Sequence, residues 1–186
     1  EETVFQIKKR SWENRDRAYW TRIGINRKIL RKFNVIPITH LWVNGILTKT
    51  DSFNTEKSVI YAYRNAKGKY DIYEPYASPS YKFRTNILYP LQGFQQLPEK
   101  GEVLVITKSM KDIMCLDRFK IPALSTLGEG KIPKPDLMEH LKSRFLTIYT
   151  LYDFDNEGVK GANKMRKEYG TKPLFLTNGR MNTLDY

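Results

Sequence analysis

The chain has 186 residues and a formal net charge of +12, from 32 basic and 20 acidic side chains. Its hydrophobic content of 40%, with 13% aromatic residues, is typical of a folded protein and excludes an intrinsically disordered chain. One cysteine excludes a disulfide within the chain, and with two histidines no zinc site is expected. No apolar run is long enough to cross a bilayer, so we expect a cytoplasmic protein. The sequence begins without methionine, and we expect a piece of a longer protein.

The positive charge is concentrated in the first half of the chain. Residues 1–100 carry 18 basic and 9 acidic side chains, whereas residues 101–186 carry 14 and 11. The first half is also rich in tyrosine and tryptophan. Basic groups among planar side chains suit a phosphate backbone with bases available for stacking, although a single tyrosine more often belongs to an aromatic core. We therefore expect this half to bind an anionic polymer or a nucleotide.

Short elements of both kinds are predicted in the first half. Two helices are predicted, over residues 13–22 and 26–33, with Asn26 as the N-cap of the second. Three strands are predicted, over residues 41–46, 59–64 and 70–73. A hairpin connection over residues 65–68 joins the last two strands. These elements predict a small basic α+β domain over residues 1–100, with mostly antiparallel strands.

The second half alternates strands with helices. Four strands are predicted, over residues 103–107, 121–126, 145–152 and 174–177. Three helices lie between them: one contains Met110 to Phe119, one begins at Pro135, and one ends at Gly170. This alternation predicts an α/β domain over residues 101–186, with a parallel sheet flanked by helices. Ligands bind such sheets in the crevice at the carboxyl ends of the strands.

An acidic segment, from Asp153 to Gly158, directly follows the third of these strands. Residues i and i+2 of an extended segment point to the same side, so Asp153 and Asp155 present two carboxylates together. Such a pair suits Mg²⁺, above all when phosphates supply the remaining ligands. A second interpretation stays open, because an aspartate at such a turn commonly caps a helix. A calcium loop of the EF-hand kind is excluded, because its twelfth position is Lys164 instead of glutamate.

The second half resembles a TOPRIM domain, the metal-binding module of bacterial-type primases, topoisomerases and some nucleases. In that family one strand ends in an acidic residue and a glycine, with an aspartate shortly after, and a later strand ends in Asp-x-Asp followed by glycine. The runs 105–112 and 153–158 resemble these two motifs, and residues 126–128 resemble the turn after the second strand. The resemblance covers residues 101–178 and implies metal binding by Asp153, Asp155 and Asp112.

One position departs from the TOPRIM motif. The first acidic residue of the family is Lys108 here, and the glycine after it is Ser109. A protonated lysine cannot coordinate Mg²⁺. Lys108 has three alternative roles: an ion pair with Asp112 or Asp153, a contact to a triphosphate, or simple exposure to water. Glu129, in the loop after the second strand, is a candidate for the missing carboxylate.

Parts of the first half resemble the polymerase core of bacterial and phage primases. The run 19–33 is similar to the helix pair at the start of that core, and the runs 61–75 and 82–93 to its basic strand pair and later positions. The resemblance implies that Arg64, Lys82 and Arg84 contact the triphosphate or the template backbone. It also implies that Asn86 fixes a sugar or a phosphate by hydrogen bonding.

Together these resemblances imply a TOPRIM-domain DNA primase that makes short RNA primers by metal-dependent nucleotidyl transfer. The implied cofactor is Mg²⁺, for which Mn²⁺ can substitute. The implied partners are single-stranded DNA, ribonucleoside triphosphates, and a helicase or zinc-binding module outside this chain, in the cytoplasm of a bacterium or a phage-infected cell. Two alternatives stay open: a TOPRIM nuclease, and a non-catalytic nucleic-acid-binding module whose metal site decayed when the acid became Lys108.

Overall fold

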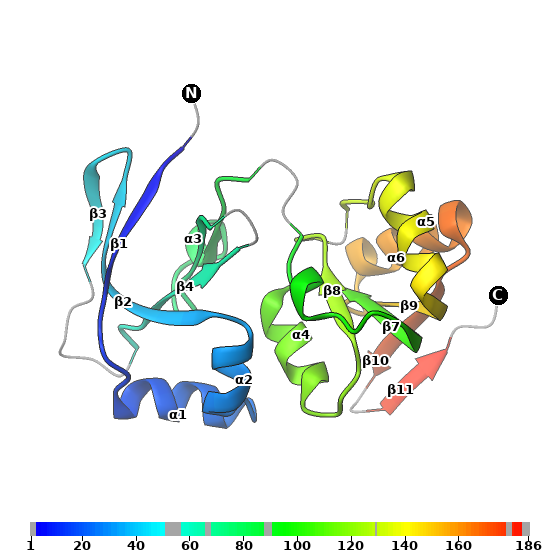
Figure 1. Cartoon of the computed structure of the whole chain (residues 1–186), viewed down its shortest axis with the longest axis horizontal. Coiled ribbons are helices and arrows are strands. Elements are labelled where there is room, and N and C mark those ends of the chain that lie inside the picture. The colour runs from blue at the N-terminus through cyan, green and yellow to red at the C-terminus, as the bar shows by residue number, and fades with distance from the viewer. Residues whose placement is uncertain are drawn as a thin grey trace. The chain divides into compact units, whose positions relative to one another are not determined.

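The chain folds into two compact units, Glu1–Leu88 and Tyr89–Tyr186, each of which is considered by itself (Figure 1). The computed structural model describes residues 3–50, 57–65, 68–87, 91–128, 130–177 and 180–183. The second unit begins earlier than the predicted boundary at residue 101, because Leu91, Phe94 and Leu97 pack against its core. None of the described helices is long and apolar enough to span a membrane.

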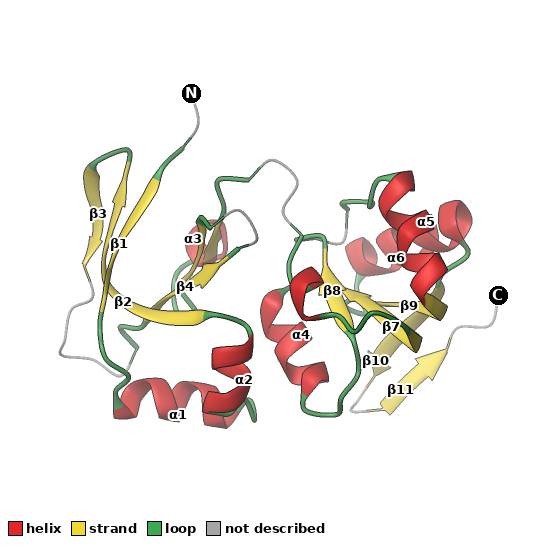
Figure 2. Cartoon of the chain, viewed as in Figure 1, coloured by secondary structure: helices red, strands yellow, loops and turns green. Residues whose placement is uncertain are grey.

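The first unit is built on an antiparallel sheet with strand order β1-β2-β4-β5-β6, and β3 also pairs with β2 (Figure 2). Its strands are β1 (Phe5–Lys9), β2 (Val35–Val43), β3 (Ile46–Thr50), β4 (Ile60–Arg64), β5 (Tyr70–Tyr73) and β6 (Phe83–Arg84). Its helices are α1 (Asn14–Arg22), α2 (Arg27–Lys32) and α3 (Pro79–Lys82). The predicted α+β architecture with antiparallel strands is confirmed.

Helix caps and one tight turn fix the local structure of this unit. Asn26 is the N-cap of α2, as predicted, and its Oδ1 accepts the backbone N–H of Lys28 at 3.0 Å. The predicted strand over residues 41–46 is wrong, because the chain turns at Asn44 and Gly45, whose φ angles are +51° and +80°. Two successive positive φ angles are what a two-residue hairpin turn of type I′ requires. The turn therefore divides the predicted strand between β2 and β3.

Strand β4 separates two cores, because alternate residues of a strand face opposite sides. Ile60 and Ala62 belong to an apolar cluster with residues of β2 and β5. Tyr61 packs on the other side, with its ring centroid 5.0 Å from that of Trp20 and 6.0 Å from that of Tyr19. Among the described residues of this unit, five tyrosine and tryptophan side chains are buried: Tyr19, Trp20, Tyr61, Tyr63 and Tyr73. These five form a core, so they are not a surface on which bases stack.

The second unit contains a five-stranded sheet with strand order β11-β10-β9-β7-β8. Its strands are β7 (Gly101–Thr107), β8 (Ala123–Ser125), β9 (Phe145–Leu151), β10 (Lys172–Thr177) and β11 (Arg180–Thr183). Its helices are α4 (Met110–Asp117), α5 (Pro135–Arg144) and α6 (Asn156–Tyr169), with a 3₁₀ turn η1 (Phe94–Gln96) before β7. The four predicted strands are parallel to one another, and β11 adds an unpredicted antiparallel edge. The predicted parallel sheet flanked by helices is confirmed.

The connections of this sheet place its helices on both faces. The chain moves from β7 to the edge strand β8 and then back across β7 to β9, so right-handed crossovers put the two connecting helices on opposite faces. Figure 2 shows α4 on one side of the sheet and α5 and α6 on the other. Side chains of α5 and α6 share one apolar cluster with Leu104 and Ile106 of β7. The chain therefore leaves β7 and β9 in opposite directions, which creates a topological switch point between these neighbouring strands.

Helix α4 is shorter than predicted. It ends at Asp117, and Phe119 lies beyond it with 68% of its surface exposed. Ile113 and Met114, which were predicted on the same apolar face, are buried. The apolar spacing therefore predicted the buried face correctly and its C-terminal limit incorrectly.

Candidate active site

The candidate site lies just beyond the carboxyl ends of β7 and β9. These strands pair in parallel, with Ile106 opposite Thr150. Lys108 follows β7 and Asp153 follows β9, so the two side chains come from adjacent positions at one edge of the sheet. This edge is the topological switch point, where open α/β sheets bind their ligands.

Lys108 and Asp153 form an ion pair between Nζ and Oδ2. Their side chains are 32% and 54% exposed, so the pair is open to solvent and to a ligand. Of the alternative roles considered for Lys108, the structure shows the ion pair with Asp153. One of the two predicted metal-binding carboxylates therefore has a cationic partner within the chain.

Asp155 is the N-cap of α6. Its Oδ1 accepts the backbone N–H of Gly158 at 2.9 Å, and its carbonyl oxygen accepts the backbone N–H of Val159 at 2.9 Å. The capping interpretation of this aspartate is therefore confirmed. Capping and metal binding are compatible, because an ionised carboxylate offers about four acceptor positions and the cap uses one. The hydrogen bond also fixes the orientation of the carboxylate.

The loop from Asp153 to Gly158 is tightly folded. A Cβ atom added to Gly158 would lie 2.0 Å from the backbone carbonyl oxygen of Asp153, a distance that no side chain can adopt. Between the two aspartates, Phe154 packs its ring 5.3 Å from that of buried Phe175 in β10. The close approach of the backbone at Gly158 and the ring contact of Phe154 therefore restrain the loop that carries the two carboxylates.

Asp112 is held at the start of α4. Its Oδ2 accepts the Ser109 hydroxyl at 2.6 Å, and the same hydroxyl accepts the backbone N–H of Asp112 at 3.4 Å. Ser109, which replaces the glycine of the family motif, is therefore the N-cap of α4. This arrangement ties the Asp112 carboxylate to its own helix.

The arrangement of the acidic side chains decides how a divalent ion could be held at this edge. Within the part of the chain that the structure describes, no group of three or more His, Cys, Asp or Glu side chains is placed to hold one metal ion. Asp153, Asp155 and Asp112 are therefore not arranged as a three-carboxylate cage, and the Asp112 carboxylate is hydrogen-bonded to Ser109. Asp153 and Asp155 alone fit Mg²⁺, which proteins commonly hold through one or two carboxylates together with substrate phosphates.

The loop after β8 contains the remaining predicted residue of this unit. Glu129 lies outside the described residues, so its candidate role stays a prediction. The small-residue turn before it has left-handed backbone angles at Leu127 (φ +57°) and Gly128 (φ +127°). The Thr126 hydroxyl donates to the Lys131 carbonyl oxygen at 2.9 Å and closes this loop.

The four predicted binding residues of the first unit differ in their surroundings. Arg64 at the end of β4 and Lys82 at the end of α3 are exposed. Arg84 forms an ion pair with Glu74, a 6% exposed side chain that also pairs with Lys49 at 3.1 Å. Burial lowers the pKa of the Arg84 guanidinium. Arg84 therefore balances a buried carboxylate, while the other two cations are accessible to phosphate.

Asn86 is likewise engaged within the first unit. Its Nδ2 donates to the backbone carbonyl oxygen of Thr3 at 2.9 Å. Its buried Oδ1 has no hydrogen-bond partner among the described residues. The amide therefore links the segment after β6 to the segment before β1. A contact of Asn86 to sugar or phosphate stays a prediction.

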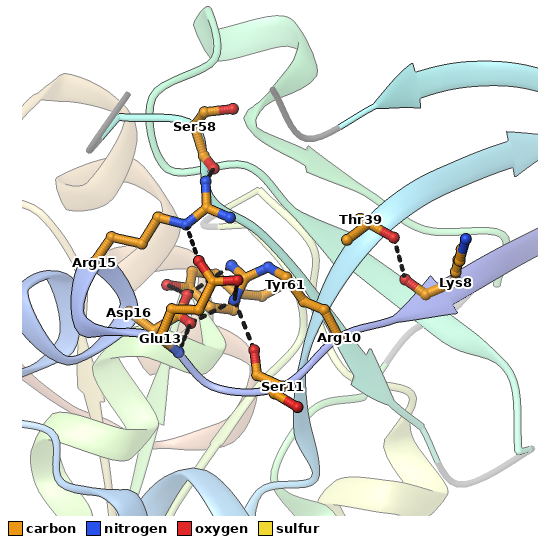
Figure 3. Close-up of polar contacts among 9 residues, drawn as sticks. All are labelled: Lys8, Arg10, Ser11, Glu13, Arg15, Asp16, Thr39, Ser58 and Tyr61. Atoms are coloured by element: carbon orange, nitrogen blue, oxygen red, sulfur yellow. Dashed lines mark hydrogen bonds and ion pairs between the residues drawn. The ribbon is translucent and has the colours of Figure 1, made fainter. Parts of the chain in front are cut away.

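A buried ionic network was missed by the sequence analysis (Figure 3). Asp16 is 0% exposed and accepts two guanidinium N–H groups of Arg10, at 2.6 and 2.8 Å. It also accepts the hydroxyl of Tyr61 and the backbone N–H of Glu13, each at 2.8 Å. Burial, followed by the negative charge of Asp16, raises the pKa of Tyr61. The spacing Glu13-x-x-Asp16, a capping-box pattern, was the only sequence signal for this network.

Comparison with solved structures shows what kind of fold carries these residues. The chain is similar to the structure of the DnaG catalytic core, with a TM-score of 0.60 and 15% sequence identity, over 87% of this chain and 64% of that chain. The chain has the fold of a primase catalytic core. No family model and no curated protein matches the sequence.

Two further structures share the primase-core fold. One is a DnaG primase catalytic domain bound to single-stranded DNA, with a TM-score of 0.58 and 15% identity, over 87% of this chain and 65% of that chain. The other is the primase fragment of the bacteriophage T7 primase-helicase protein, with a TM-score of 0.52 and 15% identity, over 93% and 66%. The chain thus spans about two thirds of each of these three primase structures, and the predicted TOPRIM primase-core fold is confirmed.

Proposed function

We propose that this chain is the catalytic core of a DNA primase, which joins ribonucleotides into short RNA primers on single-stranded DNA. The observation that carries the proposal is the place of Asp153 and Asp155. The two carboxylates lie at the topological switch point of a sheet that has the primase-core fold. A primase core needs carboxylates at this edge because its substrates are polyanions that bind together with a divalent ion.

Each residue of the site has a distinct role in this proposal. Asp153 and Asp155 would hold Mg²⁺ or Mn²⁺, and further carboxylates would come from Asp112 in the first turn of α4 and from Glu129 in the loop after β8. When bound, the ion stabilises the charge that develops on the α-phosphate and makes the attacking 3′-hydroxyl more acidic. The cap on α6 orients the Asp155 carboxylate before any substrate arrives, so this orientation costs nothing at the moment of reaction.

The first unit would bind the template and the triphosphate. Arg64 and Lys82 are exposed cations and suit direct contacts to phosphate. Arg84 and Asn86 would act at the same surface, Arg84 beside the Glu74 carboxylate that it balances. One similar primase is bound to single-stranded DNA, and the similar T7 protein is a primase-helicase. These two structures support single-stranded DNA and a helicase as partners of this chain. A zinc-binding module outside this chain, and a bacterial or phage-infected cytoplasm, belong to the same proposal.

The test compares synthesis with binding in the Asp155→Asn variant. Asparagine is as good an N-cap as aspartate, so the variant keeps the cap of α6 and loses only the charged ligand. We expect primer synthesis from labelled ribonucleotides to be lost, and single-stranded DNA binding to be retained. The control, Asp136→Asn, removes an exposed carboxylate from the first turn of α5 and should leave both unchanged. Equal loss of both activities in a folded Asp155→Asn protein would contradict the proposal.

One observation favours a second candidate, a nucleic-acid-binding module without catalysis. The ion pair between Lys108 and Asp153 supplies the kind of neutralisation that a decayed metal site would show. This candidate predicts salt-sensitive DNA binding by the wild-type protein, with neither primer synthesis nor cleavage. Strand cleavage that depends on Mg²⁺, without synthesis, would instead identify a nuclease.

A further inference from the structure

A lysine is paired with one of the two carboxylates that the proposed function assigns to metal binding. Lys108 follows β7, Asp153 follows β9, and the two side chains form an ion pair at the switch point of the sheet. Both are partly exposed, at 32% and 54%, so a ligand can reach either group. The neighbouring carboxylate of Asp112 is hydrogen-bonded to Ser109. The site therefore contains an ammonium group at the position where a metal-binding site needs negative charge.

The two kinds of ligand that a nucleotidyl-transfer site binds respond to this ammonium in opposite ways. A divalent cation is repelled by Lys108 and must also compete with it for Asp153. A phosphate is attracted by Lys108 and, while Lys108 is paired, is screened from Asp153. The interaction between unit charges at ion-pair distance is weak in water and stronger near a protein surface. Because the lysine stem has four flexible carbons, the ammonium can move between partners without movement of the backbone.

Resting on the proposed function, we propose that Lys108 is an exchangeable counter-ion of Asp153. In the nucleotide-free protein Lys108 neutralises Asp153 and weakens the binding of a divalent ion alone. When a nucleoside triphosphate enters, the ammonium passes from the Asp153 carboxylate to a phosphate oxygen. Asp153 then becomes available to the divalent ion that accompanies the nucleotide. The site thereby favours binding of metal and nucleotide together, and a lysine in place of the acidic residue is compatible with the reaction.

The test measures each ligand without the other in the Lys108→Met variant. Binding of Mn²⁺ alone is followed by the paramagnetic resonance signal of the free ion. Binding of a fluorescent ribonucleoside triphosphate is followed by anisotropy in the presence of a chelator. Methionine keeps most of the length of the side chain and removes the charge. We expect Mn²⁺ to bind about tenfold tighter to the variant than to the wild-type protein, and the triphosphate to bind about tenfold more weakly.

Two controls make the result specific to the ammonium group. Lys108→Arg keeps the positive charge and should leave both affinities within about threefold of the wild-type values. Lys164→Met removes an exposed charge from α6 and should change neither. Unchanged Mn²⁺ affinity in Lys108→Met would overturn the inference, as would a change of both affinities in the same direction. Neither readout requires synthesis, so opposite shifts without primer formation would defeat only the proposed function, and primer formation without these shifts would defeat only the role of Lys108.

Discussion

The buried network around Asp16 makes a quantitative prediction for the first unit. In Arg10→Met, the Asp16 carboxylate keeps the Tyr61 hydroxyl and the Glu13 N–H but loses both guanidinium donors. The side chains of Arg10 and Asp16 are 5% and 0% exposed, so water does not replace these donors. Removal of one partner from a buried ion pair costs about 3–5 kcal/mol. We therefore expect the free energy of unfolding of the first unit to fall by about this amount.

A graded series tests the origin of this loss. Tyr61→Phe removes one hydrogen bond to the same carboxylate and should cost about 1.5–3 kcal/mol, which is less than Arg10→Met. The control, Arg17→Met, removes an exposed guanidinium from α1, the helix that contains Asp16. Its free energy of unfolding should stay within about 0.5 kcal/mol of the wild-type value.

Urea unfolding followed by tryptophan fluorescence is the suitable assay. All three tryptophans of the chain, Trp12, Trp20 and Trp42, belong to the first unit, so their signal reports on this unit alone. Circular dichroism on the same samples reports on both units. An Arg10→Met protein that unfolds within 1 kcal/mol of the Arg17→Met control would refute the assignment of the network as a main support of this unit.

Two further predictions concern the loop of the site and the aromatic core. Gly158→Ala should abolish Mg²⁺-dependent activity and lower stability, although alanine is the better helix former, because its Cβ would lie 2.0 Å from the Asp153 carbonyl oxygen; activity and thermal melting together check this. Burial raises the pKa of Tyr19, Tyr61 and Tyr63 above the ordinary value of 10.0, so above that pH the unfolded chain releases protons that the folded chain retains. Stability should therefore fall as pH rises beyond about 10, by about 1.4 kcal/mol per pH unit for each tyrosine, and urea titrations between pH 8 and 11 measure this slope.

The sequence predicted the second unit better than the first, for a physical reason. Buried parallel strands such as β7 and β9 are largely apolar runs, and each is followed within two residues by a charged side chain, Lys108 or Asp153, that marks the edge of the sheet. In the first unit, short antiparallel strands give weaker signals, and β1 and β6 were missed. The Asn44-Gly45 turn was overlooked although this dipeptide is a strong hairpin signal, because apolar residues on both sides of it suggested one continuous strand.

At the candidate site, the sequence predicted where the residues lie better than it predicted which residues they contact. The positions of Asp153 and Asp155 could be predicted, because both follow one strand within four residues. Their contacts stood among the alternatives, but the sequence could not choose between them, because the partner of Asp153 comes from a different strand and the cap made by Asp155 depends on how the chain turns into α6. Asp16 resembled an ordinary residue of an exposed helix, because nothing in the local sequence shows that Arg10 and Tyr61 enclose it. Long-range ionic contacts depend on the fold and leave no local pattern.

Identification of the product made by the wild-type protein tests the central claim most directly. The protein is incubated with single-stranded DNA, Mg²⁺ or Mn²⁺ and labelled ribonucleotides, and the products are separated by length with and without alkali. A primase core produces short labelled chains that depend on the template and disappear in alkali. Shortened template strands, or DNA binding with no labelled product even when a zinc-binding module is added in trans, would contradict the account.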